Sequence, residues 1–247
     1  MVKALIVQIV LLALFGFISA RASVGLTLDE TEVSIGDFSE FAEATGFISL
    51  SENHGGMVYE IGWVTKPNWN WRKPYGLIAN KDEPAVHITF SEAEQYCKWK
   101  GKRLPTREEW IDAGYTESRA QPADGFKEGK IYEYPTGDFP QGANCLSDCG
   151  AEKVLKNKKQ DYGSILTRGN GHSPVGLSRR GVNGLYDMGA NVWEWARLSY
   201  ENNSVQATMG GSWWYGSRQM RADYKATKPQ NMAAVYIGFR CIKEEKR

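Results

Sequence analysis

Three short segments combine an amphipathic pattern with the start and stop signals of an α-helix. Each begins with a Ser or Thr that is followed three residues later by an acid, the capping box in which both side chains bond amides of the first turn. Apolar residues then recur at helical spacing, and a glycine ends each segment. The pattern predicts helices that start at Ser34, Ser91 and Thr106 and end at Gly46, Gly101 and Gly114.

Strand-like runs are equally short. They are VYEIGWV from Val58, AVHITF from Ala85, the stretch that leads to GGSWW, and YIGFRCI from Tyr236. From Ala120 to Arg180 no period is sustained and turn residues are frequent, so we expect a long irregular segment. A segment of this kind needs something else to hold it, such as ions or disulfides.

The composition is that of a globular protein. Of 247 residues, 42% are hydrophobic and 24% are charged, which excludes a disordered chain. The 30 basic and 29 acidic residues give a net charge of +1. Charge therefore gives no reason to expect a nucleic-acid partner, or a membrane partner beyond the N-terminal segment described next.

Residues 1–22 have the features of a secretory signal peptide. Lys3 supplies a positive start, Ala4 to Ile18 is an apolar stretch, and Ala20 and Ala22 form a cleavage site. We expect an exported chain, periplasmic or secreted, in which residues 23–247 form a single domain. An uncleaved anchor is the alternative, but the apolar stretch is shorter than the roughly 20 residues that span a bilayer.

Four cysteines are present, and export favours disulfides among them. Cys145 and Cys149 are close enough to pair locally, which would leave Cys97 to pair with Cys241. Zinc thiolates are the alternative. The three histidines do not have metal-ligand spacing, so the sequence gives no support for a histidine-rich catalytic metal site.

Eight motifs follow one another in a specific order. They are EVSIGDFSEFAEATGF, PAVHITFSEAEQYCKWKGKRLPTREEW, YPTGD, GANC, SPVG, NGLYDMGANVWEWA, MGGSWW and IGFRC. From about Leu28 to Ile242 the chain resembles the formylglycine-generating enzyme family, also called the sulfatase-modifying factor family. The resemblance implies an α+β fold similar to C-type lectins, with little regular structure, short helices around small antiparallel sheets, calcium and disulfides. The family's disulfide coincides with Cys97 and Cys241.

The resemblance also implies a structural calcium ion in NGLYDMGANVWEWA. Asp187 and Glu194 would supply carboxylates, and Ala190 and Val192 backbone carbonyls. Calcium takes about six to eight oxygens, which two acids around a turn help to provide. The alternative is that Asp187 only caps the following segment and Glu194 is solvated.

A second calcium site of the family resembles Asn144 with the carbonyl of Cys145. Asp161 is the candidate acid that would complete it, although the spacing is looser than in the family.

The chain departs from the family at the active site, whose positions correspond to Ser212, Tyr215 and Met220. Family members that oxidise cysteine to formylglycine carry two copper(I)-binding cysteines at the last two of these positions. A phenol and a thioether cannot form a bis-thiolate copper(I) site. We therefore do not expect formylglycine generation by the known mechanism, and the ligands support neither copper nor iron.

Aromatic and basic side chains gather around these positions. The candidate binding residues are Trp213, Trp214, Tyr215, Arg218 and Arg221, with a second cluster at Trp69 and Trp71. Such residues suit a groove that stacks a planar or sugar-like ligand and holds an anionic group. The alternative is that the tryptophans fill the core and the arginines form a solvated rim.

Two functions remain open on the sequence. One is a divergent oxidase or oxygenase of the family, which would need a redox metal held by His87 or His172 with acids from elsewhere, or Tyr215 with a lowered pKa as acid or proton relay. The other is a calcium-stabilised module that binds a peptide, protein or glycan without catalysis.

Overall fold

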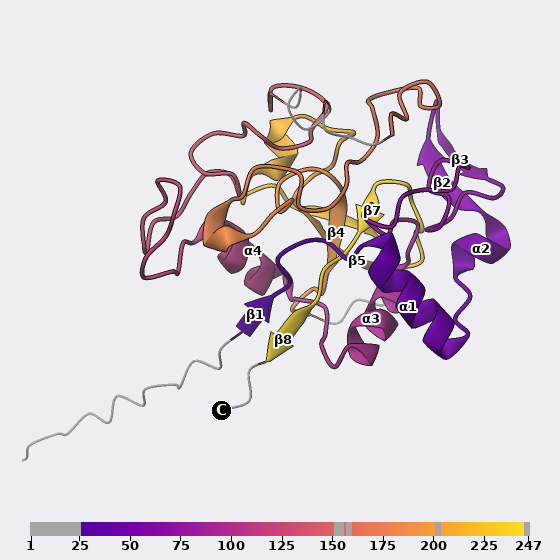
Figure 1. Ribbon diagram of the computed structural model, residues 1–247, viewed down its shortest axis with the longest axis horizontal. Coiled ribbons are helices and arrows are strands. Elements are labelled where there is room, and N and C mark those ends of the chain that lie inside the picture. The colour runs from indigo at the N-terminus through magenta and orange to yellow at the C-terminus, as the bar shows by residue number, and fades with distance from the viewer. Residues whose placement is uncertain (1–25, 151–155, 157–159, 201–203, 245–247) are drawn as a thin grey trace, which may run out of the picture.

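Short helices and small sheets are joined by long irregular segments in the computed structural model (Figure 1). The structure describes residues 26–150, 156, 160–200 and 204–244. The predicted signal segment, residues 1–22, lies outside the described residues. Within them, no helix has the length and apolar character that a membrane crossing requires.

In the part of the chain that the structure describes, four α-helices begin with a capping box: α1 (Ile35–Thr45), α2 (Leu50–His54), α3 (Phe90–Trp99) and α4 (Arg107–Tyr115). The predicted caps of α1 and α4, Ser34 and Thr106, are confirmed. In α1, Gly46 adopts the left-handed conformation that ends the helix, with φ of 68°. By contrast, α4 continues through Gly114 to Tyr115.

The predicted start of α3 at Ser91 is wrong by two residues. Thr89 is the cap, and the Glu92 carboxylate closes the box. Two overlapping Ser/Thr-to-acid pairs compete here. The Glu92 carboxylate also accepts the amide of Leu50 at 2.6 Å, which ties α3 to the missed helix α2 and favours the earlier register.

The strands form three small sheets. β1 (Leu26–Leu28) pairs antiparallel with β8 (Ile242–Glu244), and β2 (Gly56–Tyr59) pairs antiparallel with β3 (Trp63–Lys66). A four-stranded sheet has the order β6-β5-β4-β7 and contains β4 (Trp193–Ala196), β5 (Val205–Met209), β6 (Ala226–Pro229) and β7 (Ile237–Gly238). In this sheet β4 and β7 are parallel, whereas the other pairs are antiparallel.

The strand predictions succeed in part. VYEIGWV forms the hairpin β2-β3, and β5 leads to GGSWW as expected, whereas YIGFRCI divides between β7 and β8. The predicted strand AVHITF is wrong, because its amides bond carbonyls of separate segments: Ala85 bonds Val33 and His87 bonds Ala234. Strand β4 was missed, since all four of its residues are buried and do not alternate.

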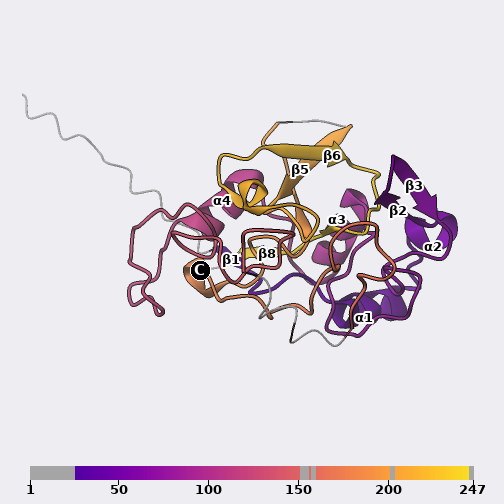
Figure 2. The same cartoon turned by 90° about the horizontal axis from the view of Figure 1, so that it is seen from above.

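The segment from Ala120 to Arg180 is irregular where it is described, with neither helix nor strand in 120–150 and 160–180. The Cys145–Cys149 disulfide holds it, with a Cα–Cα distance of 5.9 Å. A single parallel bridge joins Asn144 to Ala190. Figure 2 shows the molecule from above, with β5 and β6 on the opposite side from α1.

The main core is aromatic and contains the second disulfide. Cys97 of α3 is bonded to Cys241, which lies 144 residues further along the chain. Both residues are fully buried. No cysteine is free, so the predicted pairing is confirmed and no thiolate is available for the zinc alternative.

Arg240 is fully buried between β7 and β8, and each of its five N–H donors has an acceptor. Nε and Nη2 bond the Glu194 carboxylate at 2.8 and 2.7 Å. The other three bonds reach the carbonyls of Asp29, Glu30 and Tyr186. One guanidinium therefore joins the N-terminal segment, the loop that precedes β4, and β4 itself.

Candidate functional site

The turn that follows β5 carries the residues at the family's active-site positions. Gly210 has φ of 86°, and a Cβ there would lie 2.5 Å from the carbonyl oxygen of Met188, so only glycine fits. The Gly210 carbonyl accepts the amide of Ala190, and the amide of Trp213 bonds the carbonyl of Asn191. These bonds fix the turn against the loop that contains NGLYDMGANVW.

The three former active-site positions are largely covered by the rest of the fold. Ser212 and Met220 are fully buried, and Tyr215 is half-buried and hydrogen-bonded to Tyr236. Burial raises the pKa of Tyr215, so the phenol stays neutral. This direction is opposite to the lowered pKa that the role of Tyr215 as acid or proton relay would need.

Most of the tryptophans predicted to bind a ligand are too buried to form a binding surface. Trp71 is completely buried and donates its indole hydrogen bond to Glu52, so it is a core residue. Trp213 and Trp214 are also buried, although Trp213 lines a small pocket. Trp69 is half-buried and packs edge-on against Tyr75.

The two predicted arginines do not converge with these rings on one anion site. Arg218 is exposed. Arg221 is half-buried and paired with two acids, Glu133 and Asp223.

A connected series of rings, here called the aromatic row, does reach the surface. It runs through Tyr59, Trp63, Tyr236, Tyr215 and Trp193, with successive ring centroids 5.5, 6.0, 6.2 and 5.7 Å apart. The first two side chains come from the β2-β3 hairpin and are 41% and 42% exposed. Sequence reasoning missed them, although two aromatics flanking a short turn were a usable signal.

Cations stand over two buried rings next to the exposed part of the row, Trp193 within the row and Trp214 packed against Tyr236. The Arg168 guanidinium lies 5.6 Å from the ring of Trp214. Lys228 lies 5.9 Å from the ring of Trp193, and burial lowers the pKa of this lysine. Positive charge therefore lies beside the buried part of the row, whereas Tyr59 and Trp63 form its exposed end.

The first predicted calcium site passes a test of fit at Asp187. One carboxylate oxygen accepts the amide of Gly176 at 2.5 Å, whereas the other is buried without a partner. Asp187, Glu194 and Glu32 lie close enough to interact electrostatically around the single cation Arg240. Burial, followed by the charges of Asp187 and Glu194, raises the pKa of Glu32 well above its ordinary value. A divalent cation would neutralise this excess of buried negative charge.

Glu194 fits a calcium ligand less well than Asp187. Its carboxylate accepts two bonds from Arg240 and a third from the indole of Trp110 at 2.8 Å. The alternative reading of a solvated Glu194 is wrong, since the residue is 1% exposed.

The second predicted calcium site is only loosely assembled. The Asn144 amide donates to the carbonyl of Gly171 and to Asn191, and Cys145 is in a disulfide. Asp161 is exposed, and its carboxylate accepts the amide of Gly163. Among the described residues, no hydrogen bond links Asp161 to Asn144.

Both internal histidines are fully buried and hydrogen-bonded. His87 lies between the carbonyls of Ala233 and Pro74, and burial lowers its pKa to about 4. A neutral imidazole has one N–H, so His87 donates to only one of these carbonyls. His172 lies between the Tyr75 hydroxyl and the Glu83 carboxylate. Because both rings are fully buried, they give no support to the iron centre that a divergent oxidase would need.

A family model described as "Sulfatase-modifying factor enzyme 1-like domain" matches residues 20–245. This chain belongs to that family. It is 30% identical over 197 residues to inactive C-alpha-formylglycine-generating enzyme 2 of Mus musculus, covering 75% of this chain and 58% of the relative. It is 25% identical over 258 residues to the formylglycine-generating enzyme of Mus musculus, covering 88% of this chain and 65% of that enzyme. The family member described here thus spans less than two thirds of these two relatives.

Solved structures share the fold. The structure of PvdO from Pseudomonas aeruginosa matches with a TM-score of 0.58 and 19% identity over 89% of this chain and 80% of that chain. The crystal structure of CarF matches with a TM-score of 0.58 and 18% identity over 90% of this chain and 87% of that chain. The expected fold, with short helices, small sheets and little regular structure, is confirmed for this sulfatase-modifying factor domain.

A buried acid beside His172 makes the stability of this domain depend on pH. Burial acts to raise the pKa of Glu83, but the hydrogen bond and charge of His172 and the bond from the Tyr162 hydroxyl outweigh it and lower the pKa to about 2. A lowered carboxyl pKa stabilises the fold above the unfolded-state value near 4.5, and this contribution is lost as the pH falls towards 2.

We predict that Glu83→Gln destabilises the protein by at most about 3 kcal/mol at neutral pH. The difference from wild type should shrink between pH 4.5 and 2, because the wild-type carboxylate becomes protonated there. Urea unfolding at a series of pH values measures it. The exposed acid Glu40 provides the control, since Glu40→Gln should change the free energy of unfolding by about 0.5 kcal/mol or less. A Glu83→Gln difference that stays constant with pH contradicts the assignment.

Proposed function

We propose that this chain is an exported member of the family that lacks formylglycine-generating activity and binds an extended, acidic peptide segment of a partner protein. The observation that carries the proposal is the chemistry at Tyr215 and Met220. Tyr215 has a neutral phenol that is hydrogen-bonded to Tyr236, and Met220 has a buried thioether. All four cysteines are in disulfides, which is typical of an oxidising compartment and supports export.

The edge strand β3 supports a peptide as the ligand. In the described chain it pairs with β2 on one side only, and its side chains alternate between exposed and half-buried. An extended peptide adds to such an edge through main-chain hydrogen bonds, while side-chain pockets or ring faces provide selectivity. Trp63 at the start of β3 places the aromatic row beside this edge.

The charges near the row support an acidic ligand. Arg168 stands over the buried ring of Trp214, and Lys228 over the buried ring of Trp193. Carboxylates of a bound peptide would pair with these cations, and its apolar side chains would pack on Tyr59 and Trp63. A neutral glycan would stack on the rings but would leave the cations unused.

The family relationship supports loss of catalysis as well as the fold. One similar protein is named an inactive enzyme of the family, and others are named formylglycine-generating enzymes. The alternative of a divergent oxidase receives less support, because the two histidines it would use are fully buried and hydrogen-bonded.

We predict that Trp63→Ala weakens binding of acidic peptides by roughly tenfold, the usual cost of losing an exposed aromatic anchor. Fluorescence anisotropy with a labelled peptide library of varied charge measures the dissociation constants. The control is Trp99→Ala on α3, which removes an indole of similar exposure, 40%, from another element. Equal affinities of wild type and Trp63→Ala, or preferential binding of neutral glycans, would contradict the proposal.

We further propose that calcium binds beside Asp187 and stabilises the loop that supports the site. Asp187 would hold the ion through its unpartnered oxygen, with the carbonyls of Ala190 and Val192 as the additional ligands implied by the family. Bound calcium would neutralise the acids that Arg240 alone leaves in excess. It would serve as a structural ion.

A chelator should therefore lower the melting temperature. At free calcium of about 100 times Kd the ion contributes about 2.7 kcal/mol, which corresponds to a decrease of roughly 5 to 10 °C. Asp187→Asn should abolish the response, whereas Asp124→Asn, a change of an exposed acid, should preserve it. Differential scanning calorimetry with and without chelator measures both, and an unchanged wild-type melting temperature excludes the ion.

A further inference from the structure

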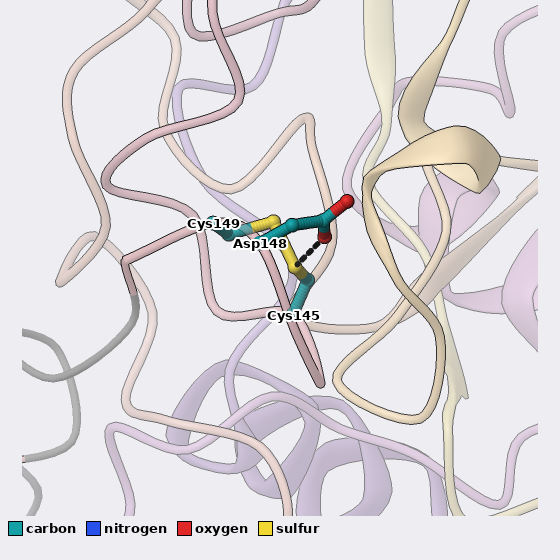
Figure 3. Close-up of side chains that lie close together, drawn as sticks. All are labelled: Cys145, Asp148 and Cys149. Atoms are coloured by element: carbon teal, nitrogen blue, oxygen red, sulfur yellow. Dashed lines mark hydrogen bonds between the residues drawn. A yellow bond between two sulfur atoms is a disulfide. The ribbon is translucent and has the colours of Figure 1, made fainter.

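The described part of the chain has cavities of different chemistry. One is lined by the Cys145–Cys149 disulfide and by Asp148, shown in Figure 3. Its donors are already in use, because the two sulfurs are bonded to each other and the amide and hydroxyl of Ser217 donate to the Asp148 carboxylate. Another cavity measures about 430 Å³ and lies between α4 and the strand pair β1-β8 (Figure 1). It shares no lining residue with the aromatic row.

This second cavity, here called the α4 cavity, has an aliphatic floor. Leu28 of β1, Leu185 and Ile242 of β8 are buried side chains that line it. The half-buried Ala113 of α4 adds a methyl group. A cavity of this size, with an apolar lining and a few polar groups, is typical of sites that bind small organic molecules.

Hydrogen bonds hold the polar wall of the α4 cavity in place. The Asn183 side chain donates to the carbonyl of Ala113, and its oxygen accepts the amide and hydroxyl of Ser118. The fully buried Glu117 carboxylate accepts three bonds from Arg119. The wall is therefore formed in the absence of a ligand, and binding does not have to order it.

Asp112 is the acid at this cavity that has no matching cation. Both oxygens of Glu109 accept bonds from Arg103 at 2.7 Å, and Arg119 is paired with Glu117. Asp112 also lines the cavity and is exposed, and among the described residues it has no ion-pair partner. The cavity therefore carries one carboxylate whose charge the surrounding side chains leave unbalanced.

The position of Asp112 on α4 adds to this imbalance. The residue lies three positions after Glu109, on the same face of the helix, where like charges repel. It also lies in the last turn of α4, next to the negative end of the helix dipole, and this turn has no basic residue. A cation bound at Asp112 would relieve both interactions.

We propose that the α4 cavity binds a small amphipathic organic cation, an amine with an aliphatic body. The ammonium group donates to the Asp112 carboxylate, a charge-assisted hydrogen bond that fixes one end of the ligand. The aliphatic body packs on Leu28, Leu185 and Ile242, and removal of its surface from water contributes the rest of the affinity. This binding is independent of the peptide site proposed at the aromatic row.

Other classes of ligand match the cavity less well. The Glu109 oxygens are occupied by Arg103, so Asp112 would be the one free carboxylate for a metal ion, whereas calcium takes about six to eight oxygens. An anionic ligand would face the Asp112 charge, while the two arginines beside the cavity are already paired. Charge and lining together therefore select an amine.

The test is an NMR titration of the whole ¹⁵N-labelled protein with three probes that share one alkyl chain: hexylamine, hexanol and hexanoate. Hexylamine should bind saturably and shift the amide signals of Ala113 and Ser118. Hexanol should bind roughly tenfold more weakly, because it cannot make the charge-assisted hydrogen bond to Asp112. Hexanoate should not bind.

Substitutions separate the roles of charge and shape. Asp112→Asn should reduce the affinity for hexylamine to that for hexanol and leave hexanol binding unchanged, which also shows that the cavity is intact. Ala113→Leu, which fills the cavity from α4, should abolish binding of both probes. Glu43→Gln changes an exposed acid on α1 and should bind as wild type does.

The proposal is overturned if hexylamine does not bind saturably or if hexanoate binds as tightly. It is equally overturned if Asp112→Asn keeps the wild-type affinity for hexylamine, or if a folded Ala113→Leu variant still binds the amine.

Discussion

The bonds of one buried guanidinium hold this structure together. Arg240 uses all five donors, two on Glu194 and three on backbone carbonyls from two other segments. In a fold with so little regular structure, these hydrogen bonds join separate segments of the chain, which a continuous sheet does in other folds. A buried charge is tolerated only when it is paired and fully hydrogen-bonded, and lysine cannot reproduce the planar fork.

The loop fixed by Arg240 in turn positions the candidate site. Asp187, Ala190 and Asn191 all have positive φ, between 50° and 66°, a conformation that persists only where the surroundings enforce it. Asn191 contributes through its side chain, which donates to Glu32 and accepts from Asn144. The backbone of this loop is hydrogen-bonded to the turn after β5. The loop therefore helps to position both the aromatic row and the segment that carries Met220.

Local chemistry made much of the fold predictable from sequence. Ser34 and Thr106 were identifiable as caps because the acid three residues later is part of the same bond pair. The Cys145–Cys149 pairing followed from proximity in the chain. What failed depended on distant partners. Glu92 set the start of α3 by reaching Leu50, and burial of β4 on both faces erased the alternation that reveals a strand.

The candidate site was harder to predict, because burial decides which aromatic side chains a ligand can touch. Trp71 and Trp63 are both tryptophans near turns, but the first is completely buried and the second is 42% exposed. Likewise, the family resemblance suggested Glu194 as a calcium ligand, whereas its carboxylate is bonded to Arg240, which lies 46 residues away in sequence. Exposure and long-range ion pairs are properties of the packed chain.

The most direct test of the central claim is conversion of a cysteine-containing peptide. The purified protein is supplied with copper(I) and oxygen and compared with an active formylglycine-generating enzyme on a peptide which that enzyme converts. Mass spectrometry follows loss of the thiol and appearance of the aldehyde. We predict oxidation to formylglycine by the active enzyme and none by this protein. Catalytic aldehyde formation by this protein would contradict the account.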